Sequence, residues 1–92
     1  MKSLLRKRIQ RDIRDTKANT ELSRLFEWTG EGDTFLEGRD KESGDSILIE
    51  YPKEWPWLRP IIHYSKLPEV KHEWNPSLPT WAYLLYLVTM PS

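Results

Sequence analysis

Cysteine is absent from this 92-residue chain. Its absence excludes disulfide cross-links, zinc sites built from thiolates and any thiol nucleophile. Histidine occurs twice, at His63 and His72, which leaves few side chains for metal binding or general base catalysis. From the residues alone we expect a protein that is not an enzyme and that holds no cofactor and no metal.

Long hydrophobic runs are also missing. The longest apolar stretch, residues 81–90, is too short to cross a lipid bilayer. The charged N-terminal segment "MKSLLRKRIQ" is not followed by an apolar region, so it lacks the pattern of a secretory signal. We expect a soluble, cytoplasmic protein with no membrane partner.

Aromatic side chains, in contrast, are abundant: the chain has five Trp, four Tyr and two Phe. A chain of this length forms one domain, here residues 1–92, and buries only about 60–65% of the surface of the unfolded chain. Its hydrophobic core is therefore modest, and we expect it to depend on large side chains.

Charge is distributed unevenly along the chain, although the formal net charge is zero. Residues 1–18 carry seven basic and two acidic side chains, a net charge of +5, which residues 19–92 balance. The basic N-terminal segment could therefore attract an acidic partner.

Two segments have the pattern of helices. Leu5, Ile9 and Ile13 recur at helical spacing among charged residues, so residues 3–17 are predicted to form an amphipathic helix that ends before "NT". The segment "TWAYLLYLVTM", residues 80–90, contains no helix breaker. We predict a second helix there, with Thr80 as its N-terminal cap.

Short strands are predicted between the two helices. Two of them fall within residues 21–36, on either side of "TGEGD", whose glycines would allow a turn at positive φ. Residues 38–45 are expected to form a polar connection.

Alternation of apolar side chains predicts two further strands. One places on a single face Ile47, Ile49 and Tyr51. The other lies within "PIIHYS", residues 60–65, with Ile62 and Tyr64 as alternates. The predicted fold class is therefore α+β: an N-terminal helix, an antiparallel meander of about four strands, and a C-terminal helix.

The stretch "YPKEWPWLRP", residues 51–60, has a proline at every fourth position. Proline lacks an amide hydrogen and holds φ near −65°, so the stretch cannot be a paired central strand, and we predict an extended crossing over the protein surface. Two interpretations are open. The stretch is either a rigid loop that covers the core, or an exposed recognition surface in which Trp57 is the ring left outside.

This stretch is similar to the run F-P-x-x-Y-P-x-x-P-P that follows the third strand in the ubiquitin-conjugating enzyme family. Further along, "IHY" at 62–64 resembles the family's V-x-F, "WNP" at 74–76 resembles its W-x-P, and "SLPTWAYLLYLV" is similar to the helix that follows. Upstream, "RKRIQRDIRD" resembles the family's first helix and "LFEWTGEG" its first two strands. Together these similarities imply a minimal ubiquitin-conjugating-like fold.

The sequence departs from the family where the family's chemistry takes place. Active members carry an H-P-N turn and then a catalytic Cys before the W-x-P, but only "SKLPEVKHE" separates Tyr64 from Trp74 here. Leu67 and Glu69 stand where the His and Asn would be, and a carboxylate at the Asn position would repel a developing oxyanion. The resemblance therefore implies a non-catalytic variant.

The resemblance also implies two partner-binding surfaces. It assigns the basic first helix to contact with an activating enzyme, and the loop with Trp57, together with Pro76 and Ser77, to contact with ligases. Trp and Arg are also the residue types that dominate binding energy at interfaces. The candidate partner-binding residues are Arg6, Arg8, Arg11, Arg14, Trp55, Trp57, Trp74 and Pro76. The expected partner is a protein, such as a ubiquitin-like protein or a component of a conjugation-like system.

Other functions remain open. The basic helix could contact nucleic acid, although the acidic remainder of the chain would repel the strand. The chain could instead be a structural subunit of a larger viral or microbial defence assembly. His63, or the group Glu69, His72 and Glu73, could have a metal-binding or acid-base role, but the spacing of these residues fits no closed zinc site. The arginines could also form an ordinary solvated helix face.

Overall fold

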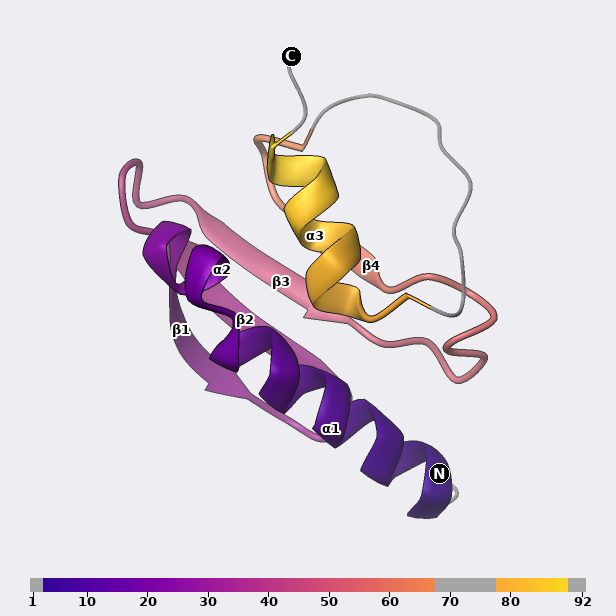
Figure 1. The fold of residues 1–92 in the computed structure, drawn as a ribbon. Helices are drawn as coiled ribbons and strands as arrows, with labels where there is room; N and C mark the ends of the chain where they lie inside the picture. Colours follow the sequence, from indigo (N-terminus) through magenta and orange to yellow (C-terminus); the bar gives the residue numbers. More distant parts are fainter. Residues whose placement is uncertain (1–2, 68–77, 90–92) are drawn as a thin grey trace.

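The computed structural model describes residues 3–67 and 78–89, which form an α+β fold (Figure 1). Four antiparallel strands make one sheet in the chain order β1-β2-β3-β4, and helices pack on one of its faces. The elements are α1 (Ser3–Ala18), α2 (Thr20–Leu25), β1 (Phe26–Glu31), β2 (Phe35–Asp40), β3 (Ser46–Glu50), β4 (Ile61–His63) and α3 (Thr80–Thr89). The predicted class, an N-terminal helix, a four-strand antiparallel meander and a C-terminal helix, is confirmed.

Helix α1 follows the predicted amphipathic pattern. Ile9 and Ile13, four residues apart and therefore on one side of the helix, are fully buried, and Leu5 packs partly against them. The charged residues between them are mostly exposed. Burial of this apolar stripe is what holds α1 against the sheet.

The short helix α2 occupies residues that the sequence pattern assigns to a helix end and a strand, so that prediction is wrong. Asn19 ends α1, but its side-chain oxygen also accepts a hydrogen bond of 3.0 Å from the amide of Leu22. The same residue therefore caps the next helix. Leu22 is fully buried in the core, and this burial holds the six-residue helix α2 in place.

Strand β2 continues to Asp40, through residues predicted to be a polar connection. Alternate residues Leu36, Gly38 and Asp40 face the helices and are buried. A Cβ atom on Gly38 would lie 2.7 Å from Trp28 Cε3 and 2.8 Å from the carbonyl oxygen of Glu27. Glycine thus lets the Trp28 ring lie across the β1–β2 pair, and the strand extends through a sequence that looks like a loop.

Positive φ occurs at one of the described glycines, Gly44, at 81° in the loop between β2 and β3. The prediction of positive φ in "TGEGD" is therefore wrong. Gly32 in that turn is needed for space instead, because a Cβ atom there would lie 2.2 Å from Phe35 Cε1.

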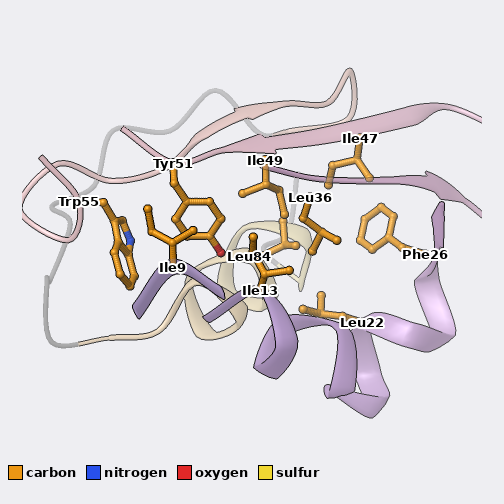
Figure 2. Close-up of a cluster of buried hydrophobic side chains, with 10 residues drawn as sticks. All are labelled: Ile9, Ile13, Leu22, Phe26, Leu36, Ile47, Ile49, Tyr51, Trp55 and Leu84. Atoms are coloured by element: carbon orange, nitrogen blue, oxygen red, sulfur yellow. The ribbon is translucent and has the colours of Figure 1, made fainter. Parts of the chain in front are cut away.

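The hydrophobic core lies between the sheet and the three helices (Figure 2). In Figure 2 the strand side chains point toward those of the helices, with Phe26 at one end of the row and Trp55 at the other. The ten residues of this core are Ile9, Ile13, Leu22, Phe26, Leu36, Ile47, Ile49, Tyr51, Trp55 and Leu84. The predicted shared face of Ile47, Ile49 and Tyr51 is confirmed, and all three are buried.

A buried carboxylate joins three parts of the fold. Asp12 on α1, 6% exposed, accepts hydrogen bonds from the Tyr51 hydroxyl and, at 3.1 Å, from the amide of Thr80 at the start of α3. The carbonyl of Pro79 accepts the first helical bonds from Ala82 and Tyr83, so Pro79 occupies the cap position and has no side-chain acceptor to offer. The predicted capping role of Thr80 is therefore wrong.

Asp12 thus supplies the oxygen that α3 needs at its first turn. Burial, and then the neighbouring charge of Asp12, raise the pKa of Tyr51 well above its usual range, so the phenol stays a hydrogen-bond donor. The end of β3 and the start of α3 are in this way held to one side chain of α1.

Replacing Asp12 by alanine tests this junction. Asp12→Ala leaves the Tyr51 hydroxyl and the Thr80 amide buried without their acceptor, and it should lower the free energy of unfolding by about 2–4 kcal/mol. The matched control is Asp15→Ala, an exposed position on the same helix, which should change it by less than about 0.5 kcal/mol. Urea denaturation at pH 7 measures both. Equal effects of the two substitutions would contradict the assigned role.

Candidate functional site

The proline-rich segment between β3 and β4 forms tight turns, so the predicted extended crossing is wrong. The amide of Trp55 bonds to the carbonyl of Pro52 at 3.1 Å, and the amides of Trp57 and Leu58 bond to the carbonyl of Glu54 at 2.8 and 3.2 Å. The peptide bond between Trp55 and Pro56 is cis. The prolines are spaced widely enough to leave these amides free to close turns, which satisfies the backbone locally.

These turns send two neighbouring tryptophans in opposite directions. Trp55 is 8% exposed and packs edge-on against Tyr51, with ring centroids 5.3 Å apart, while the Arg8 guanidinium lies 5.8 Å from its ring. Trp57 is 77% exposed. The segment therefore covers part of the core through Trp55 and leaves the Trp57 ring outside, whereas its use for recognition stays a prediction.

Trp57 has apolar neighbours on the surface. Leu58 and Ile61 are each 54% exposed, and we call these three residues the Trp57 surface. A groove of about 400 Å³ adjoins it, with walls from the same segment, from β4 and from α3. The groove is lined by Leu58, Arg59, Pro60, Ile61, Ile62, Leu67 and Tyr83. Large apolar side chains that stay exposed together on a small domain are typical of a docking surface.

The four candidate arginines of α1 are exposed but do not form one row. At about 100° per residue, Arg6 and Arg8 point roughly 160° apart. Arg6 lies 3.4 Å from Asp33 in the β1–β2 turn, whereas Arg8 and Arg11 line a groove of about 240 Å³ beside Trp55.

This arrangement weakens the nucleic-acid alternative. Lys17 pairs with Glu31, just as Arg6 pairs with Asp33, so two of the cations are already neutralised within the chain. Asp15 lies in the groove with Arg8 and Arg11. Fewer cations are therefore free to neutralise phosphates than the count of basic residues in α1 suggests.

Two candidate residues, Trp74 and Pro76, lie outside the described residues, as do Ser77, Glu69, His72 and Glu73. His63 is described: its Nε2 atom lies 3.0 Å from Glu50 on the solvent face of the sheet, and both side chains are exposed. Within residues 3–67 and 78–89, no group of three or more metal-ligating side chains comes together.

A polar cluster around Asp40 was not predicted from the sequence. Its carboxylate accepts hydrogen bonds from the Tyr64 hydroxyl, from Lys66 at 3.2 Å, and from the amides of Glu42 and Ser43 at 2.8 and 3.2 Å. The Tyr64 bond, followed by the two amides and Lys66, holds the pKa of Asp40 well below its usual range. Burial and the bond to Asp40 raise the pKa of Tyr64.

This cluster stabilises the fold. The donors around Asp40 satisfy both of its oxygens and close the β2–β3 loop. A sequence signal for it exists, because an Asp directly before "KESGD" is the pattern of an Asx turn.

Comparisons of the chain with models of known protein families, with curated proteins and with solved structures gave no match. Among the helices of the described part of the chain, none is long and apolar enough to span a membrane.

The Asp40 cluster should make stability depend on pH at the acid end. Because the folded chain lowers the pKa of Asp40, its contribution is complete above the unfolded value of about 3.9 and is lost as the pH falls through the folded pKa. Tyr64→Phe removes the largest cause of the lowered pKa. We expect the variant to be less stable by about 1 kcal/mol at pH 7, with the difference shrinking below pH 4. Urea midpoints from pH 2 to 7 measure it, and a difference that stays constant over that range would count against the assignment.

Proposed function

We propose that this chain is a non-catalytic protein-binding module of ubiquitin-conjugating-like architecture. Its partner is a ubiquitin-like protein or a component of a conjugation-like system, bound through the Trp57 surface with help from the cations of α1. The observation that carries the proposal is the 77% exposure of Trp57 on a turn whose neighbouring tryptophan is buried.

Rigidity makes Trp57 suited to binding. An exposed tryptophan offers a large apolar area with few torsions to restrict, and a fixed backbone lowers the entropy lost on association. The turn that carries Trp57 is anchored by buried Trp55 and Pro56 and by two bonds to the carbonyl of Glu54. Little conformational entropy of the loop would therefore be lost when Trp57 binds a partner.

The order of elements is compatible with the resemblance. The proline-aromatic run follows the third strand, a basic helix precedes the sheet and another helix follows it, which is the order that the family motifs imply. With no thiol in the chain, the module would hold a partner without forming a thioester with it.

The cations of α1 are proposed to steer the partner. Lys7, Arg11 and Arg14 are exposed, and a cluster of positive charge raises the encounter rate with an acidic surface in a salt-dependent manner. The contribution of these residues is expected in the association rate more than in the lifetime of the complex.

A permanent structural interface is the second candidate. Exposure of Leu58 and Ile61 beside Trp57 suits a subunit that is always covered in a larger assembly. The two candidates differ in behaviour alone: a transient module is monomeric in solution, whereas an obligate subunit self-associates or precipitates. Multi-angle light scattering on the purified chain separates them.

Trp57→Ala tests the proposed surface. The variant is measured by biolayer interferometry against a panel of immobilised ubiquitin-like proteins and activating enzymes. Loss of an aromatic anchor should weaken the affinity about 30-fold, with thermal stability unchanged. Leu25→Ala, an exposed leucine on α2, is the matched control and should bind like the wild type.

Two results would refute the proposal. One is a wild-type chain that binds no member of the panel, and the other is binding that Trp57→Ala leaves intact.

A further inference from the structure

The two edges of the sheet are protected unequally. On β1 the exposed Glu27 and Glu31 and an irregularity in register between Trp28 and Gly30 disfavour pairing with another chain. On β4 the residues are Ile61, Ile62 and His63, and among the described strands only β3 pairs with it. Among the described residues, the three-residue edge strand β4 thus carries aliphatic side chains and no acidic residue.

The groove next to the Trp57 surface runs along this edge. Ile61 and Ile62 are successive residues of β4, so their side chains point to opposite faces of the sheet. Both residues line the groove, which therefore lies against strand β4. Leu58 and Leu67, also in its lining, lie before and after the strand, and Tyr83 of α3 contributes another part of its wall.

The charge that the described residues bring to the groove is positive. Among the described lining residues Arg59 is the charged one, and none is acidic. The Arg59 Nη1 atom donates a hydrogen bond to the Tyr83 hydroxyl at 3.1 Å, which positions the guanidinium. A guanidinium held in this way has further donors for a carboxylate.

We propose that the β4 edge binds an extended acidic peptide segment of the partner as a fifth strand of the sheet. Backbone hydrogen bonds to β4 would supply affinity, an aliphatic side chain would fill the groove, and a Glu or Asp carboxylate would pair with Arg59. This inference rests on the proposed function and names the chemistry of the partner. A second copy of this chain is the poorer occupant, because each copy brings an arginine and no carboxylate from the described groove.

Two fluorescent octapeptides test the inference, one alternating Val with Glu and the other alternating Val with Lys. Fluorescence polarisation with the full chain should show the acidic peptide binding at least 10-fold more tightly. Arg59→Glu should reverse that preference. Ile61→Lys, a charge placed on the edge strand, should abolish binding, while Thr29→Lys on the opposite edge strand serves as the matched control and should not.

Hydrogen exchange distinguishes strand addition from side-chain docking. Amides within residues 61–63 should exchange more slowly when the acidic peptide is bound. Binding without that protection, no binding at about 1 mM peptide, or a dimer in light scattering that Ile61→Lys dissolves would each overturn the inference.

Failure of this inference can be told from failure of the proposed function. If a panel protein binds the wild type, loses affinity with Trp57→Ala and keeps it with Arg59→Glu, while neither octapeptide binds, the proposed function is supported and the β4 edge is not its peptide site. If the octapeptides bind as expected and no panel protein does, the edge site stands and the ubiquitin-like partner is wrong.

Discussion

The carboxylate of Asp12 is the constraint on which the rest of this fold depends. In a small chain without cysteine, one buried anion accepts from the end of the β3 segment and from the first turn of α3, and so ties both to α1. A buried charge is tolerated only where its hydrogen bonds are satisfied, so this contact permits few alternative positions for α3. The hydrophobic core then fills the space that the three segments enclose.

The same contact determines where the candidate surface lies. Tyr51, bonded to Asp12, is also the residue against which Trp55 packs, and Trp55 precedes the turn that carries Trp57 outward. A chain of contacts thus runs from a polar junction in the interior to an exposed tryptophan. The groove along β4 continues that surface, and Arg59 adds a positive charge to it. The buried contacts of Tyr51 and Trp55 therefore fix the position of the exposed Trp57 side chain.

Local patterns predicted a large part of the fold because they reflect direct burial. The helical spacing of Ile9 and Ile13 and the alternation of Ile47, Ile49 and Tyr51 both correspond to buried faces. The wrong predictions have a common cause, because the local structure in each case depends on contacts that a local sequence pattern does not contain. The extension of β2 depends on Trp28 lying over Gly38, and the turns of residues 52–58 depend on amides that the prolines left free. For the site, the proline pattern left open whether Trp57 is exposed, and the groove needed Tyr83 from α3.

The sequence by itself determined the class of fold, the amphipathic first helix, the strand faces and the lack of thiol chemistry, because spacing and composition express these directly. Tertiary structure alone decided which tryptophan is buried, how the arginines of α1 divide between different neighbours, and that Asp12 rather than Thr80 caps α3. The physical reason is that burial, ion pairing and tertiary capping are relations between residues far apart in the chain, and a local pattern contains only one member of each pair.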